Sequence, residues 1–365
     1  MLIETIQPGD NIQSFLDLLN TGGGGILNLN PTDTYFVNND LNLYSNVTIN
    51  GSGSVIDFGG GAYGLKAIGT NSYFTGTISV NFGSTIVTGL GTVWTINMIG
   101  QEILIGDYFY LVDNVTSHTS LTLDTTYIGL NISGASYVIA DTIDNISIVD
   151  LTLINSSSIL LDFQYVDGFI KDGIFITNGL QGIRGQNSAN VQLLNSNVDN
   201  CTTGISYKNV PYCTLTNWAV TNISGGTGFD LNGVTNTSIG INALQNITGV
   251  GIKFTNCSNL GMINYSIIQC TSHGIEFVSG NADMDVGSGY INSCEGDGLK
   301  LTATSNRIEI ATTDSLNNTG FGFNIANANC SRNIFTGNNT FNNTAGALND
   351  SGTSTLKSST VNNFI

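Results

Sequence analysis

Charged residues are scarce in this 365-residue sequence, where Asp, Glu, Lys and Arg together make up 10%. A helical bundle is not built from so little charge and 45 glycines. Basic residues are the rarest of the charged ones, with nine against 26 acidic residues and a net charge of −17. This balance argues against nucleic acid or an anionic membrane as a partner and leaves neutral or cationic surfaces open.

Long apolar runs are also lacking, since no stretch approaches the length that a membrane span needs. The N-terminus lacks the basic start and apolar run of a secretory leader. Six cysteines in a chain of this length do not make a disulfide scaffold. We therefore expect a cytosolic protein, one matured from a longer precursor, or one carried out of a cell inside a virion.

Glycine and apolar residues, in contrast, are abundant and periodic. The hydrophobic fraction of 41% allows a real core. A glycine followed by alternating apolar residues recurs at steps of 24, 23, 23, 24 and 24 residues. The repeat glycines are Gly204, Gly228, Gly251, Gly274, Gly298 and Gly322.

This period predicts an all-β fold, a right-handed single-stranded parallel β-helix in which each coil stacks three short strands on those of the next. A leucine-rich repeat has a similar period, but its fixed leucine framework is missing. The residues one and three positions after each glycine should point inward, and the residue between them outward. We expect the glycine itself to serve a turn with positive φ.

The first part of the chain predicts a different element. Asp10 is a plausible N-cap, and a short amphipathic helix should cover the open end of the stack. Its apolar face would consist of Ile12, Phe15, Leu16 and Leu19. Early strands are expected at Ile26 to Asn30, Tyr35 to Val37, Asn46 to Asn50 and Val55 to Phe58.

Between about residues 75 and 140 the rhythm stops, and we predict a small β-barrel or sandwich inserted into the solenoid. Its strands are expected around Thr77 to Val80, Ile86 to Thr88, Ile103 to Ile105, Tyr108 to Val112, Leu121 to Leu123 and Tyr137 to Ile139. The organisation is thus 1–74 for the cap and first coils, 75–140 for the insert, 141–350 for the main β-helix and 351–365 for a polar tail.

Two resemblances follow from these segments. Gly24 to Asn30, Thr34 to Val37 and Asn46 to Gly53 resemble the opening of pectate-lyase-like β-helix proteins, a superfamily that includes phage tailspikes. The insert is similar to a β module of phage tail and fibre proteins. The stretches that carry this second resemblance are Gly83 to Gly89, Gly91 to Trp94, Ser120 to Leu123 and Ser133 to Tyr137.

The catalytic motifs of that superfamily do not transfer. The calcium-binding aspartate cluster and catalytic arginine of pectate lyases cannot be placed around Arg184, Arg307 or Arg332. Of the polygalacturonase motifs, only Ser272-His273-Gly274 comes near to one. The resemblance therefore implies the fold and a virion setting, and neither of these two activities.

The outward position of the repeat carries charges of alternating sign. Stacked about 4.8 Å apart, opposite neighbours would each contribute roughly 0.2 to 1 kcal/mol and set the register. Asp230 and Glu276, two coils or about 9.6 Å apart, are also candidates for the acid and base of an inverting glycosidase. Lys253 between them opposes that role. The outward positions are Arg184, Ser206, Asp230, Lys253, Glu276, Lys300 and Asn324.

A second catalytic candidate is the pair His273 and Asp297, which precede repeat glycines in adjacent coils, with Glu295 close by. An imidazole beside a carboxylate can act as a general base. An incidental surface histidine is the alternative. Asp283 and Asp285 offer two oxygen ligands, but the rest of a calcium loop is missing, so we expect neither a metal nor another cofactor.

Aromatic residues are the candidates for glycan binding, since ring faces suit sugar rings, although a core position is the common alternative for tryptophan. The candidates are Trp94, Tyr108 and Tyr127 in the insert and Trp218 in the solenoid. Cys270 and Cys294, each four residues before a repeat glycine, should stack as buried apolar groups.

Three functions of different classes fit this pattern. The first is a spike or fibre on a virion surface, expected to form a homotrimer with other virion proteins nearby and to contact a polysaccharide or cell-surface glycan. The second is a polysaccharide depolymerase, a hydrolase or lyase, for which an extracellular location is also open. The third is a purely structural virion component, because a fold does not decide function.

Overall fold

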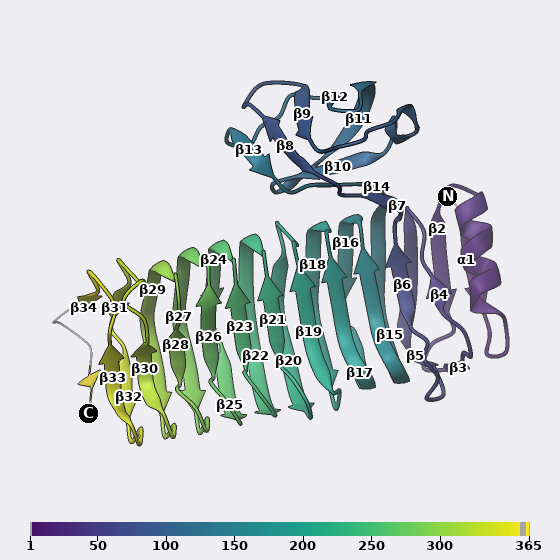
Figure 1. The fold of residues 1–365 in the computed structure, drawn as a ribbon. Helices are drawn as coiled ribbons and strands as arrows, with labels where there is room; N and C mark the ends of the chain where they lie inside the picture. The colour runs from purple at the N-terminus through teal and green to yellow at the C-terminus, as the bar shows by residue number, and fades with distance from the viewer. Residues whose placement is uncertain (1, 358–362, 365) are drawn as a thin grey trace.

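The computed structural model describes residues 2–357 and 363–364 and forms a right-handed parallel β-solenoid, as the repeat predicts. Its 27-stranded sheet winds from one end of the molecule to the other (Figure 1). The strands of the repeat motif form one side, here called the ladder face. The ladder face comprises β4 (Leu41–Asn42), β6 (Leu65–Ile68), the end of β15 (Ile143–Gln164), β17 (Phe175–Gln186), β19 (Thr203–Lys208), β21 (Phe229–Asn232), β23 (Ile252–Thr255), β26 (Ile275–Ser279), β28 (Leu299–Leu301), β30 (Phe321–Ile325) and β33 (Gly346–Asp350).

The remaining strands form the other sides of the coils. Within the described residues, no helix is long and apolar enough to cross a membrane. Part of the tail predicted at 351–365 lies outside the described residues. The strands of the other sides are β1 (Leu2–Ile6), β2 (Gly25–Leu29), β3 (Thr34–Phe36), β5 (Val47–Asp57), β16 (Val166–Asp172), β18 (Ala189–Asp199), β20 (Thr214–Ile223), β22 (Thr235–Ile247), β24 (Ser258–Ile263), β25 (Ser266–Cys270), β27 (Ala282–Asn292), β29 (Asn306–Leu316), β31 (Ile334–Thr336), β32 (Asn339–Phe341), β34 (Leu356–Lys357) and β35 (Asn363–Phe364).

The helix α1 (Ile12–Thr21) covers the N-terminal end of the stack, as predicted (Figure 1). The prediction that Asp10 caps it is wrong, because the side chain of Asn11 accepts the Ser14 backbone N–H at 3.2 Å. Asp10 accepts the Gln7 backbone N–H instead, at 2.8 Å. The helix packs into the solenoid core through Ile12, Leu16 and Leu19, with Phe15 partly buried beside them.

The inward columns of the repeat are buried, as predicted, and form one continuous core. Phe254 and Phe277 stack in adjacent coils with ring centroids 5.0 Å apart. Such stacking of like side chains along the axis fixes the register between coils. The two columns are Ile205, Phe229, Ile252, Ile275, Leu299 and Phe323, and Tyr207, Leu231, Phe254, Phe277, Leu301 and Ile325.

The repeat glycines do not serve positive-φ turns, so that prediction is wrong. None of these six glycines has φ in the left-handed region. They allow close approach between coils instead. A Cβ on Gly228 would lie 2.7 Å from the Gly251 carbonyl oxygen, and one on Gly274 would lie 2.6 Å from that of Gly298. Real Cβ atoms do not come so near, which explains why glycine recurs at this position.

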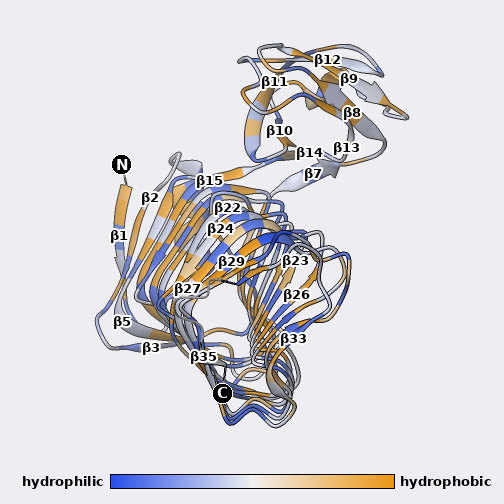
Figure 2. Ribbon diagram, turned by 90° about the vertical axis from the view of Figure 1, so that its left-hand side faces the viewer, coloured by the Kyte–Doolittle hydropathy of each residue, from blue (hydrophilic) through white to orange (hydrophobic). Residues whose placement is uncertain are grey.

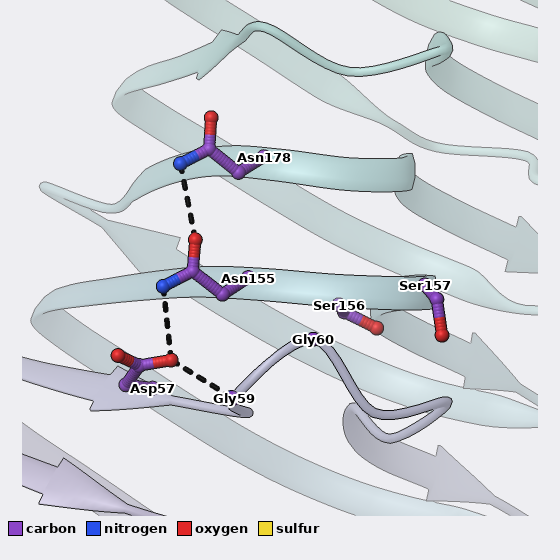
Figure 3. A pocket seen from close by; sticks show the side chains of 7 residues that line it. All are labelled: Asp57, Gly59, Gly60, Asn155, Ser156, Ser157 and Asn178. Atoms are coloured by element: carbon purple, nitrogen blue, oxygen red, sulfur yellow. Dashed lines mark hydrogen bonds between the residues drawn. The ribbon is translucent and has the colours of Figure 1, made fainter.

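Asparagine occupies many of the turns that need positive φ, because its short amide side chain tolerates this conformation. Asn155, Asn178 and Asn200, in successive coils, have φ of 61°, 60° and 48°. Asn178 Nδ2 donates to Asn155 Oδ1 at 3.1 Å, and Asn155 Nδ2 donates to Asp57 Oδ1 at 3.0 Å (Figure 3). The asparagine-rich composition thus reflects ladders of amides along the turns.

The insert is a separate eight-stranded antiparallel sheet that stands beside the solenoid (Figures 1 and 2). It has its own core, and β15 pairs directly with β5 and β6, so the coils continue in register across the insertion. Six strands lie where the sequence predicts strands, and β7 and β13 were not anticipated. The insert comprises β7 (Thr70–Tyr73), β8 (Thr77–Val80), β9 (Ile86–Leu90), the short helix η1 (Ile96–Met98), β10 (Glu102–Ile105), β11 (Tyr108–Ser117), β12 (Ser120–Leu123), β13 (Ile132–Ala135) and β14 (Val138–Asp141).

Candidate functional site

The outward column predicted from the sequence is present on the ladder face and is longer than expected. Each member is the direct parallel-strand partner of the next, so the side chains repeat at the strand spacing of about 4.8 Å. Compared with the predicted set, the column has two more residues at its N-terminal end, Lys66 and Asp162, and one more at its C-terminal end, Asn349. In order it reads Lys66, Asp162, Arg184, Ser206, Asp230, Lys253, Glu276, Lys300, Asn324 and Asn349.

Positive charge is concentrated on this face. Five of the nine basic residues of the chain occupy outward positions of its strands, on a protein whose net charge is −17. Three of these cations are paired with carboxylates, namely Lys66 with Asp40, Arg184 with Asp162 and Lys253 with Asp230. The five are Lys66, Arg184, Lys208, Lys253 and Lys300.

Ion pairs between neighbouring coils hold part of this column. Arg184 binds Asp162 in a bidentate pair, with Nε–Oδ1 at 3.0 Å and Nη2–Oδ2 at 2.6 Å. The Asp162 side chain is 2% exposed and that of Arg184 is 38% exposed, so the carboxylate is buried while the guanidinium still reaches solvent. Lys253 Nζ lies 3.7 Å from Asp230 Oδ1. Lys253 thus stands between Asp230 and Glu276, where an inverting glycosidase would need its water and substrate.

His273 and Asp297 meet in adjacent coils, as their shared column predicts. The Asp297 backbone N–H donates to His273 Nδ1 at 2.9 Å, and the Asp297 carboxylate lies 3.5 Å from the same nitrogen. On the other side of the ring, Lys300 Nζ lies 3.1 Å from Nε2. Both carboxylate oxygens of Asp297 also accept hydrogen bonds, from the Phe321 backbone N–H at 2.7 Å and from Asn324 Nδ2 at 2.8 Å.

This environment keeps His273 neutral. Burial and the Lys300 ammonium lower its pKa, against the opposing effects of Asp297 and Glu276. A neutral imidazole can accept a proton, which a general base requires. Asp297 contacts the ring through its backbone N–H, whereas its carboxylate oxygens are engaged with Phe321 and Asn324. Glu276 is the neighbouring carboxylate on the same face.

A cleft of about 580 Å³ lies where the insert meets the ladder face. Its walls combine apolar side chains of the insert with amides and a lysine of the solenoid, the composition expected of a small-molecule site. The sequence did not reveal it, because its two walls are far apart along the chain. The residues that matter most for its chemistry are Phe74, Asp107, Tyr165, Gln186, Asn187 and Lys208.

Polar contacts between distant segments fix the geometry of this cleft. Asp107 Oδ1 accepts the Thr235 hydroxyl at 2.5 Å, and Asp107 Oδ2 accepts Asn236 Nδ2 at 2.7 Å. The Tyr108 and Tyr212 hydroxyls are hydrogen-bonded to each other. The insert is therefore docked on the solenoid by side-chain hydrogen bonds, which preorganises the cleft.

Three of the four predicted glycan-binding aromatics are core residues instead. Trp94, Tyr127 and Trp218 are at most 3% exposed, so their ring faces are not available to a sugar. Trp94 Nε1 donates to the Tyr137 hydroxyl, and Trp218 Nε1 to the Leu193 carbonyl, which satisfies both buried indoles. Tyr108 is half-buried at the insert junction.

The other residues singled out in the sequence make contacts that hold neighbouring coils together. Asp283 is paired with Arg307 in the next coil, with Nε–Oδ1 at 2.5 Å and Nη2–Oδ2 at 2.6 Å. Within the described residues, no cluster of three or more His, Cys, Asp or Glu side chains could hold a metal ion. Cys270 and Cys294 are buried neighbours in one column, as predicted. The hydrogen bond between their thiols, together with burial, raises the pKa of Cys270.

No protein-family model and no curated protein matches this sequence, but solved structures share its fold. The A-module of the mannuronan C-5 epimerase AlgE6 of Azotobacter vinelandii is 13% identical, with a TM-score of 0.53 over 96% of this chain and 94% of that one. The periplasmic alginate epimerase AlgG is 10% identical, with a TM-score of 0.51 over 97% and 83%.

A third similar structure is the tailspike protein of E. coli bacteriophage HK620, solved in complex with a pentasaccharide. It is 11% identical, with a TM-score of 0.53, and the match covers 93% of this chain and 65% of the tailspike. At such low identity these likenesses show the fold alone. The chain has the right-handed parallel β-helix fold that its repeat predicts.

Proposed function

We propose that this protein is a virion-surface spike or fibre that binds a polysaccharide of a cell surface along its ladder face. The observation that carries the proposal is the outward column on this face. It offers cations, carboxylates and amides at a regular spacing of about 4.8 Å over ten coils.

Such a column suits an extended polymer rather than a compact ligand. A polysaccharide presents hydroxyl groups along its whole length, and a row of side chains that both donate and accept hydrogen bonds can follow it. A tailspike of the same fold that was solved with a pentasaccharide supports a carbohydrate ligand. The resemblance of the insert to phage tail modules supports the virion setting and, with it, assembly as a homotrimer beside other virion proteins.

A polysaccharide depolymerase is the second candidate, because His273, Asp297, Lys300 and Glu276 gather on the same face. His273 would be the proton acceptor and Asp297 the residue that orients it. In this case the wild-type protein releases new reducing ends or unsaturated sugars from a polysaccharide that it binds, and His273→Ala abolishes the release without abolishing binding.

The proposal is tested by binding to a printed microarray of bacterial and mammalian oligosaccharides. We expect binding, and Lys253→Gln should weaken it about tenfold, because a hydrogen bond to a charged group contributes about 1.5–3 kcal/mol. Arg307→Gln is the matched control, since it removes the same charge at an exposed position of β29, which lies outside the ladder face. Absence of any bound glycan would leave the purely structural role, and equal losses in both variants would mean that only net charge matters.

A further inference from the structure

One turn that faces the insert has an unusual residue. The turn that follows most ladder-face strands contains a residue with positive φ. In four successive coils this residue is Asn187, Asn209, Gly233 and Asn256, with φ of 48°, 55°, 65° and 52°. In the coil beside the insert the same position is Tyr165, with φ of 56°. Its backbone N–H donates to the Gln186 carbonyl, just as that of Asn187 donates to the Lys208 carbonyl.

A tyrosine is poorly suited to this conformation. Asparagine and glycine adopt the left-handed region readily, whereas a bulky side chain there is strained. Tyr165 also ends the amide ladder in which Asn209 Nδ2 donates to Asn187 Oδ1 at 2.9 Å. Such strain persists only where the surrounding structure imposes it, and it is found preferentially at ligand and active sites. The local fold alone would favour asparagine here.

Tyr165 lines the cleft between the insert and the solenoid. The cleft volume of about 580 Å³ lies within the range typical of small-ligand sites. The half-buried ring of Tyr165 contributes an aromatic wall. Polar groups lie around it on the neighbouring coils, namely Gln186, Asn187, Lys208 and Asn209.

The Lys208 ammonium beside the ring is available to a ligand. No carboxylate of the described residues lies within ion-pair distance of the Lys208 ammonium. Asp107 lines the same cleft, but both of its oxygens are engaged with Thr235 and Asn236. An aromatic wall with amide and ammonium donors beside it matches a pyranose ring, which has apolar C–H faces and a rim of hydroxyl groups.

We propose that this cleft is a second carbohydrate site that holds a single sugar unit against Tyr165. The site opens onto the ladder face, because Gln186 and Lys208 lie two positions after the column residues Arg184 and Ser206 on the same strands. A terminal or branching unit enters the cleft while the rest of the polymer lies along the column. This inference rests on the proposed function for the class of its ligand.

The test uses Tyr165→Asn, which places in this coil the residue that its neighbours already have. We expect the variant to fold with an unchanged or higher melting temperature, because asparagine relieves the strain. Binding to the microarray oligosaccharide with the strongest wild-type signal should weaken about tenfold in calorimetric titration. Tyr165→Phe, which keeps the ring, should bind within about twofold of the wild type.

The possible outcomes are distinct. Unchanged affinity in Tyr165→Asn would overturn the second site, even while Lys253→Gln still weakens binding and so upholds the ladder face. A fall in melting temperature that accompanies the loss of binding would assign Tyr165 to the docking of the insert, which also overturns the proposal. If no oligosaccharide binds the wild type, the proposed function fails together with this inference.

Discussion

Asparagine amides stacked along the turns connect the coils of this molecule at the level of single residues. Asn178 donates to Asn155 at 3.1 Å and accepts from Asn200 at 2.6 Å. Each of these residues also relieves a left-handed backbone that other side chains tolerate poorly. One side chain therefore has two separable effects, a conformational one and a hydrogen-bonding one.

We predict that Asn178→Ala lowers the free energy of unfolding by about 2–3 kcal/mol, since it loses both the amide bonds and the tolerance of positive φ. Asn178→Gly should cost only about 1 kcal/mol, because glycine keeps the backbone conformation and loses the bonds alone. Urea unfolding of both variants measures the difference. An equal loss in the two variants would contradict the conformational part of this account.

Lys171 is a charged residue type in the buried interior of the solenoid. It is fully buried, its Nζ has no hydrogen-bond partner, and it lies 4.5 Å from the centroid of the Trp218 ring. Burial places the pKa of this amine well below its usual range. The folded protein therefore holds Lys171 neutral at a pH where the unfolded chain binds a proton.

Because the unfolded state binds more protons, this group makes stability rise with pH between its lowered pKa and its ordinary pKa of about 10.4. Lys171→Met should raise the free energy of unfolding at pH 7 by about 1–3 kcal/mol and should remove that part of the pH dependence. Urea midpoints of the wild type and the variant at pH 7 and pH 9 provide the measurement. If the variant is less stable than the wild type at pH 7, the buried amine does not lower the stability of the folded protein, and this account is contradicted.

At the residue scale, the sequence predicts which side chains are buried wherever a single periodicity determines their direction. The alternation after each repeat glycine correctly separates buried Phe254 from outward Lys253, because strand side chains alternate. The same reasoning misassigned the glycine, since a sequence does not distinguish a need for positive φ from a need for space. Trp94 and Trp218 occupy the core, the alternative position expected for tryptophan, because composition does not determine which aromatic residues are buried.

At the scale of elements, the docking of the insert on the solenoid depends on few groups. Asp107, in the turn before β11, accepts hydrogen bonds from Thr235 and Asn236 at the start of β22. The alternation of apolar residues predicts most strands of the insert. No local pattern predicts this contact, because it joins positions 128 residues apart.

We predict that Asp107→Ala loosens this junction and leaves the solenoid intact. Hydrogen–deuterium exchange should become faster in β10 and in the turn around Asp107, by about tenfold, while the amides of β26 and β28 exchange as in the wild type. Asp113→Ala is a matched control, because Asp113 is exposed on β11 of the same insert. Unchanged exchange at the junction would show that apolar contacts alone hold the insert.

At the scale of the whole molecule, the period of 23 or 24 residues determines the architecture, and the outward column follows from it. The meeting of His273 with Asp297 was predictable because both precede repeat glycines in neighbouring coils. The cleft beside Tyr165 was not, since it arises between two parts of the fold. The unusual tyrosine among asparagine turns was the signal in the sequence that could have pointed to it.

The proposed virion setting predicts a homotrimer in solution. Light scattering of the purified protein should give three times the mass of one chain. A monomer would count against the spike assignment and would favour a free-standing carbohydrate-binding protein or enzyme, with the ladder face still available to its ligand.

The central claim, that a polysaccharide lies along the ladder face, is tested most directly by acetylation of lysine amines with and without the glycan selected on the microarray. Lys208, Lys253 and Lys300 report on the ladder face, and Lys357, which is paired with Asp350 at the far C-terminal end, serves as the internal reference. We predict that saturating glycan slows the modification of these three amines at least about fivefold and leaves Lys357 unchanged. Equal modification of the three amines in the presence of a glycan that binds would place the ligand elsewhere and contradict the account.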